Sequence, residues 1–167
     1  MESKSLILDH SQVMQRIERM AWQILELAHG QGDLVIAGIV DSGYVLAEML
    51  GQQIERISQV NYELAKVDID KERPMQSEVQ ISLPKASLEG KWVVLVDDVL
   101  NTGGTLAYSL VPFLQVPVRG LTMAVLVDRE HHRYPIWADI QGLSLSTTMR
   151  ERIEVQLAPD ACAVYLS

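Results

Sequence analysis

The chain contains one cysteine, Cys162, so neither an internal disulfide bond nor a cysteine-based metal site can form, and we expect this residue to be buried in the last strand. No apolar run approaches the roughly 20 residues that a membrane-spanning helix needs. No long apolar segment follows the first residues, so we expect no signal peptide and a cytoplasmic protein. With 167 residues, 48% of them hydrophobic, the chain is expected to form a single domain over 1–167.

Basic residues are also scarce. Lys and Arg number 14 against 22 Asp and Glu, which gives a formal net charge of −8, and no long basic block occurs. Non-specific binding of nucleic acid depends on neutralising phosphates with Lys and Arg. The composition therefore argues against RNA as a partner.

Apolar strand patterns alternate with amphipathic helical patterns along the chain. Strands are predicted at 34–39, 61–68, 93–97 and 121–127, near 136–140, and more weakly at 153–157 and 161–166. Helices are predicted over 9–29, with Asp9 as the N-cap, over 44–57, and after the turn at 102–105. The apolar face of the last helix is predicted to consist of Leu106, Ala107, Leu110, Val111 and Leu114. This alternation is typical of an α/β fold with a mainly parallel sheet flanked by helices.

Residues 69–90 form a long polar connection interrupted by Pro74, Pro84 and Gly90. A connection of this length inside a compact domain is usually functional or mobile. Lys71 and Arg73 within it could reach a bound anion. We favour the alternative for each of them, an exposed loop charge.

The most informative segment is 93–105, Val-Val-Leu-Val-Asp-Asp-Val-Leu-Asn-Thr-Gly-Gly-Thr. Its apolar part predicts a buried strand, and Asp97 and Asp98 would lie at its carboxyl end, where open α/β sheets bind ligands. Gly103 and Gly104 allow a tight turn, and the free N–H groups of the following helix form an anion site. Two acids beside an anion site suit a sugar phosphate. The alternative is an ordinary strand–turn–helix unit without a ligand. The presence of both acids and both threonines in one run disfavours it.

This run resembles the phosphoribosyl-pyrophosphate (PRPP) motif of the type I phosphoribosyltransferases. The wider chain resembles the uracil phosphoribosyltransferase/pyrimidine-operon attenuator family in the stretches 7–9, 35–43, 93–105, 124–135, 138–139 and 155–157. The resemblance implies the type I phosphoribosyltransferase fold, a mainly parallel sheet flanked by helices with a small hood from the chain ends. It also implies a homo-oligomer, a dimer, that transfers the phosphoribosyl group of PRPP to a nucleobase with Mg²⁺ bound through PRPP.

The resemblance also assigns roles to individual residues. Asp97 and Asp98 would be catalytic, contacting the ribose hydroxyls or the metal and its waters. The 5′-phosphate would be held by Asn101, Thr102, Gly103, Gly104 and Thr105. The pyrophosphate loop would consist of Asp41, Ser42 and Gly43. The base would be contacted by Asp128, Arg129 and Ile140.

The chain departs from the family pattern at several positions. The pyrophosphate loop commonly reads Thr-Arg-Gly, whereas Ser42 stands at the arginine position and Asp41 is equally well interpreted as a helix N-cap. Asn101 replaces the aspartate that the 6-oxopurine relatives are proposed to use as a base, and an amide cannot take a proton. We therefore favour uracil as substrate. The alternative is a PRPP- or nucleotide-binding regulator with little or no turnover.

Adjacent histidines, His131 and His132, raise the question of a metal site. Neighbouring side chains on a strand or turn point apart, and no third ligand is evident in the sequence. We therefore favour solvated or hydrogen-bonded histidines over metal ligands.

Overall fold

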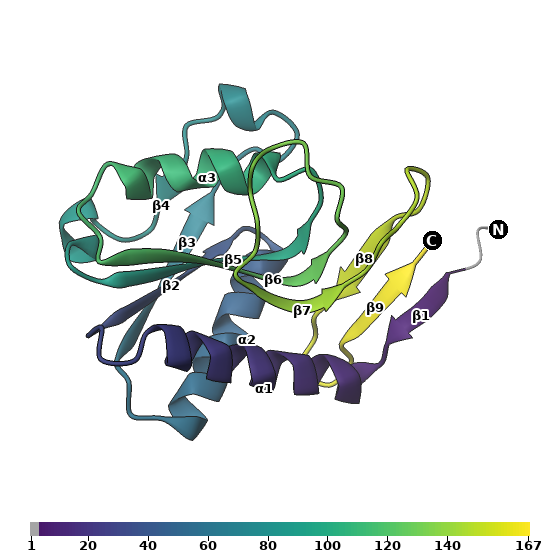
Figure 1. Cartoon of the computed structure of the whole chain (residues 1–167), viewed down its shortest axis with the longest axis horizontal. Coiled ribbons are helices and arrows are strands. Elements are labelled where there is room, and N and C mark those ends of the chain that lie inside the picture. Colours follow the sequence, from purple (N-terminus) through teal and green to yellow (C-terminus); the bar gives the residue numbers. More distant parts are fainter. Residues whose placement is uncertain (1–3) are drawn as a thin grey trace.

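A computed structural model describes residues 4–167 as two sheets and three α-helices (Figure 1). The larger sheet has the strand order β4-β3-β2-β5-β6-β7 and is parallel except for β4, which pairs antiparallel with β3. Its strands are β2 (Leu34–Ile39), β3 (Tyr62–Asp68), β4 (Gln80–Ile81), β5 (Trp92–Leu100), β6 (Gly120–Asp128) and β7 (Ile140–Ser144). The expected α/β fold with a mainly parallel sheet is confirmed.

Helices cover both faces of this sheet. The helices α1 (His10–Leu27) and α2 (Ser42–Ile57) pack on one face, and α3 (Gly104–Leu114) packs on the other (Figure 1). The predicted N-cap of α1 is confirmed, because Asp9 Oδ1 accepts a hydrogen bond from the Gln12 N–H at 2.9 Å and Gln12 Oε1 accepts one from the Asp9 N–H at 3.0 Å. None of the helices described is both long and apolar enough to cross a membrane.

The chain ends form a second, smaller sheet. It consists of β1 (Ser5–Leu8), β9 (Ala163–Leu166) and β8 (Ile153–Gln156), all antiparallel, and it stands beside the carboxyl end of the large sheet (Figure 1). This sheet is the expected hood. Two short 3₁₀ helices, η1 (Pro74–Gln76) and η2 (Lys85–Leu88), lie in the connection from β3 to β5. Cys162 is buried as expected, but it lies one residue before β9.

Two sequence predictions about local structure were wrong. The strand expected near 136–140 begins only at Ile140, because the Asp139 side chain, rather than a strand carbonyl, accepts the hydrogen bond of the Met123 N–H at 2.8 Å. The expected face of α3 was also misplaced, since Val111 and Leu114 are 47% and 67% exposed. Leu106 is buried and Leu110 packs against the core as expected, but Ser109, Pro112 and Phe113 are buried in place of Val111 and Leu114. Because this helix is apolar on nearly all sides, periodicity alone does not select its inner face.

The packing of α3 predicts a large loss of stability at one residue and almost none at the next. Phe113→Ala should lower the free energy of unfolding by about 3 to 5 kcal/mol, because it removes a fully buried aromatic side chain. Leu114→Ala, the matched control, should change it by less than about 1 kcal/mol. Urea unfolding of both variants measures the difference, and equal losses would contradict this packing.

Candidate active site

The site begins where β5 extends beyond its neighbour. The β2–β5 ladder ends at Gly38 opposite Val96, whereas β5 continues to pair with β6 as far as Leu100 opposite Asp128. The strand is therefore longer than predicted, and both acids of the motif belong to it. Asp97 is the first residue without a partner on the β2 side. This is the position in an α/β sheet at which ligands bind.

The loop at the start of α2 presses against this position. A Cβ atom at Gly43 would lie 2.8 Å from the Val96 carbonyl oxygen and 2.9 Å from Asp97 Oδ1, so only glycine allows this approach. The Val40–Asp41 peptide bond is cis. Asp41 occupies the N-cap position of α2 but makes no side-chain capping bond. The predicted pyrophosphate loop is thus adjacent to the acids, and it carries no cationic side chain.

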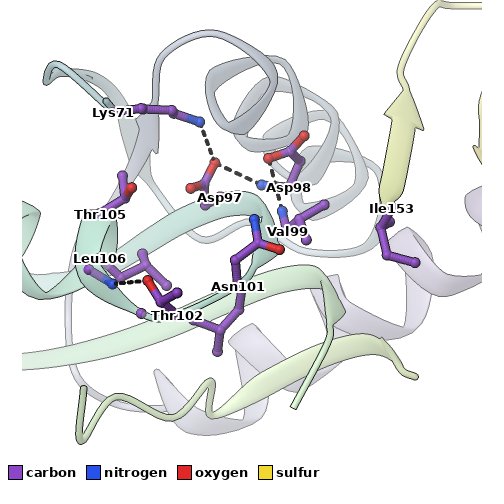
Figure 2. A pocket seen from close by; sticks show the side chains of 12 residues that line it. Lys71, Asp97, Asp98, Val99, Asn101, Thr102, Thr105, Leu106 and Ile153 are labelled. Atoms are coloured by element: carbon purple, nitrogen blue, oxygen red, sulfur yellow. Dashed lines mark hydrogen bonds and ion pairs between the residues drawn. The ribbon is translucent and has the colours of Figure 1, made fainter. Parts of the chain in front are cut away.

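A cavity of about 270 Å³ opens beside the acids (Figure 2). Its walls are formed by Lys71, Asp97, Asp98, Val99, Leu100, Asn101, Thr102, Gly103, Gly104, Thr105, Leu106 and Ile153. Every residue that the sequence assigned to the catalytic acids and to the 5′-phosphate turn lines it. The residues of the predicted pyrophosphate loop and of the predicted base contact do not belong to these walls.

One end of the cavity is suited to an anion. Gly103 has a φ of 88°, a left-handed conformation that favours glycine, and it turns the chain into α3. The Ala107 N–H donates to the Gly103 carbonyl at 2.9 Å, which closes the first turn of the helix. The preceding N–H groups, those of Thr105 and Leu106 included, point out of the helix N-terminus, and a phosphate would bind there.

The acids carry unusual electrostatics. Asp97 is only 3% exposed, and its Oδ1 accepts hydrogen bonds from Lys71 Nζ at 3.1 Å and from the Asp98 N–H at 3.0 Å. Burial raises the pKa of the Asp97 carboxyl to about 7, the Lys71 ammonium opposes this shift, and the Asp98 carboxylate adds to it. Asp97 is therefore poised between its neutral and charged forms near neutral pH.

Lys71 both fits and exceeds the favoured interpretation. It is a loop charge with 39% of its side chain exposed, and its ammonium group also reaches the buried Asp97 from the connection that follows β3 (Figure 2). Sequence alone offered the charge and the polar connection as signals. It offered no means of choosing Lys71 over Arg73, because the contact joins residues 26 positions apart.

Two predicted base contacts lie behind the cavity instead of on its wall. Asp128 is buried at the carboxyl end of β6, where its Oδ1 accepts hydrogen bonds from His132 Nε2 and from the Glu130 N–H, each at 2.8 Å. Arg129 Nη1 donates to Asn101 Oδ1 at 3.0 Å, and its other donors reach the connection between β7 and β8. His132 is thus held by a carboxylate. In residues 4–167 no cluster of three or more metal-binding side chains occurs.

The third predicted base contact, Ile140, is not brought to the site. It is 1% exposed and pairs with Ala124 at the amino end of β7, within the core beneath α1 and α2. The assignment rested on the family resemblance, and the structure puts this residue at the amino end of β7, away from the ligand-binding edge. The apolar residues that line the cavity are Val99, Leu100, Leu106 and Ile153. Ile153 comes from the hood, and no local motif marks it.

Two carboxylates and a helix N-terminus at the carboxyl edge of a parallel sheet define the class of α/β proteins that bind phosphorylated sugars or nucleotides. The chain belongs to the phosphoribosyl transferase domain family, whose sequence profile matches residues 3–157. It is 34% identical over 161 residues to the bifunctional protein PyrR of Streptomyces coelicolor, covering 92% of this chain and 83% of the relative. It is 36% identical over 165 residues to that of Brevibacillus brevis, covering 95% and 92%. The family resemblance inferred from the sequence is confirmed.

Solved structures share the fold at lower identity. A hypoxanthine phosphoribosyltransferase of Trypanosoma cruzi superposes with a TM-score of 0.73 at 19% identity, covering 86% of this chain and 78% of that one. One from Staphylococcus aureus gives a TM-score of 0.71 at 22% identity, covering 84% and 77%. The type I phosphoribosyltransferase fold is thereby confirmed.

The raised pKa of Asp97 makes stability depend on pH. Between the ordinary value of 3.8 and about 7, the folded protein holds a proton on Asp97 that the unfolded chain has lost. Stability from this group is therefore full below about pH 4 and declines as the pH rises to about 7. Asp97→Asn mimics the neutral form, so its free energy of unfolding should exceed that of the wild type by a margin that grows over this range.

The margin should reach on the order of 4 kcal/mol at pH 8, because one unit of pKa corresponds to about 1.4 kcal/mol. Denaturant unfolding of both proteins at several pH values measures it, and the carboxylates remote from Asp97 cancel in the difference, whereas Asp98, which acts on Asp97, does not. A margin that stays constant between pH 4 and pH 8 would contradict the assigned environment of Asp97.

Proposed function

We propose that this protein transfers the phosphoribosyl group of PRPP to uracil, forming uridine 5′-monophosphate (UMP) and pyrophosphate. The order of chemistry along the cavity carries the proposal. Thr102 and Thr105 belong to the anion-binding end, Asp97 and Asp98 follow, and Val99 and Ile153 form apolar walls (Figure 2). A phosphate, a ribose and a flat base would meet complementary groups in that order.

The two acids suit the ribose and its metal. Mg²⁺ is commonly bound by one or two carboxylates together with substrate phosphates and waters. Asp97 and Asp98 offer such oxygens and leave the remaining ligand positions to PRPP and water, which fits a metal that enters with its substrate. When bound, Mg²⁺ would neutralise charge on the pyrophosphate.

The residues of the chain would act mainly by position and charge. Phosphoribosyl transfer develops positive charge on the ribose ring, which the adjacent carboxylates stabilise. The turn at 102–105 would fix the 5′-phosphate and so hold the ribose in line with the base. Lys71 Nζ, 3.1 Å from Asp97, is the cation on the cavity wall and would face the leaving pyrophosphate.

Uracil is favoured over a 6-oxopurine by two observations. Asn101 on the cavity wall cannot serve as the proton acceptor that an aspartate would supply. The chain is also much more similar to the PyrR proteins, at 34% and 36% identity, than to the hypoxanthine enzymes, at 19% and 22%.

We propose a homodimer as the assembly.

A second function is supported by the loop at residues 41–43. A regulator that binds PRPP or a nucleotide with little turnover needs no cation there, and the relatives are named bifunctional. The net charge of −8 disfavours RNA as the partner of such a regulator.

An activity screen tests the proposal. With PRPP and Mg²⁺, uracil should give UMP faster than hypoxanthine, guanine, xanthine, adenine or orotate gives its nucleotide. Asp98→Asn combined with Thr105→Val should abolish PRPP binding without lowering the melting temperature appreciably, because both side chains face the cavity. A faster reaction with a purine would reject uracil. Tight PRPP binding without turnover on any base would establish the regulator.

Restoring the missing charge tests the pyrophosphate loop. Ser42→Arg should raise turnover with uracil by about tenfold, since a cation facing the leaving group stabilises the transition state. Gln52→Arg adds the same charge to an exposed position of α2 and should have no effect. Equal rates in the two variants would locate the limitation at the base end of the cavity.

A further inference from the structure

Arg129 joins three segments that are far apart in the sequence. Its Nη1 donates to Asn101 Oδ1 at 3.0 Å, its Nε to Thr147 Oγ1 at 3.1 Å, and its Nη2 to the Glu151 carbonyl at 2.6 Å. Its backbone N–H donates to the Leu100 carbonyl at 3.1 Å. The end of β5, the end of β6 and the connection to the hood therefore meet at one guanidinium group.

This contact fixes which way the Asn101 amide faces. A guanidinium group has five N–H donors and no acceptor, so only the carbonyl oxygen of Asn101 can face it. The amide nitrogen, bonded to the same carbon as that oxygen, is not held by Arg129, so its two hydrogens are left for another acceptor. Figure 2 shows Asn101 with its amide group turned toward the side of the cavity that holds Asp98 and Val99.

We propose that Asn101 determines base specificity by donating a hydrogen bond to a ring-carbonyl oxygen of the base, and that Arg129 is its positioning residue. The inference rests on the proposed function, which puts the base beside Val99 and Ile153. An oxygen at that place accepts the Asn101 hydrogen. An amino group of a base at that place would face the Asn101 amide N–H, so two donors would meet and both would lack an acceptor. This role replaces the 5′-phosphate contact expected for Asn101.

The same guanidinium group also positions the apolar wall. Glu151, whose carbonyl it holds, lies two residues before Ile153, and the Thr148 N–H donates to Glu151 Oε2 at 2.6 Å. The donor from β5 and the apolar wall from the hood are therefore set relative to each other by one residue. Such an arrangement selects both the shape of a ring and the position of its oxygen.

Nucleotide binding tests the role of Asn101 without requiring turnover. Isothermal titration calorimetry would compare UMP with 2-thio-UMP and 4-thio-UMP, because sulfur is a weak acceptor. One of the two sulfur analogues should bind the wild type about tenfold more weakly than UMP, and Asn101→Ala should bind that analogue and UMP equally. Ribose 5-phosphate should bind both proteins alike, since its phosphate is held by the turn at 102–105.

A second arginine, Arg150, provides a matched control for the role of Arg129. Arg129→Gln should lose the discrimination between UMP and the sulfur analogue while it keeps its affinity for ribose 5-phosphate. Arg150→Gln, in the same connection to the hood and exposed, should retain the discrimination. Thermal unfolding would show that both variants are folded, and Arg129→Lys, which keeps the charge, should restore part of the discrimination.

The outcomes separate the inference from the proposed function. A wild-type protein that binds no UMP would overturn the proposed function and the inference with it. If the wild type binds UMP, and Asn101→Ala still binds the sulfur analogue more weakly than UMP, the inference alone would be overturned. If Asn101→Ala binds all ligands more weakly by the same factor, ribose 5-phosphate included, Asn101 would contact the 5′-phosphate and not the base.

Discussion

The buried carboxyl group of Asp97 is the constraint to which the rest of the site responds. It lies where β5 has lost β2 as a partner, so its backbone is still held by β6 while its side chain faces the gap. Removal from water favours the neutral form, and a single lysine only partly compensates. A folded protein that keeps such a group accepts a cost in stability, which is typical of binding and catalytic sites.

The neighbouring elements are shaped around this group. Gly43 is required because the start of α2 approaches Asp97 so closely, and that closeness brings the loop at 41–43 to the acids. The loop contributes no cation of its own, and Lys71 reaches the same carboxylate from the connection that follows β3. Positive charge in this part of the cavity thus comes from a polar segment outside the regular elements. The charge balance of the site depends on how that segment is placed.

The sequence predicted the sheet, the motif and the hood. It did not predict the position of residues that are placed by contacts between distant segments. The run 93–105 was interpretable because its acids, turn and helix start are contiguous, and the structure puts all of them on one cavity. Ile140 was expected at the base from the family resemblance, but β7 begins at this residue and pairs it with Ala124, which places it in the core. The inner face of α3 was misassigned because Val111 and Phe113 are both apolar and only packing distinguishes them.

The two ends of the cavity are therefore specified in different ways. The phosphate end is formed by consecutive residues on one strand–turn–helix unit, so a short motif suffices to identify it. The proposed base end combines Asn101, which follows β5, Arg129, which follows β6, and Ile153 from the hood. Their arrangement depends on the hydrogen bonds of Arg129 to residues 28 and 22 positions away. Small changes in those contacts can alter which base is bound without disturbing the phosphate site. A contiguous motif therefore identifies the family, whereas the proposed position of the base depends on tertiary contacts of Arg129.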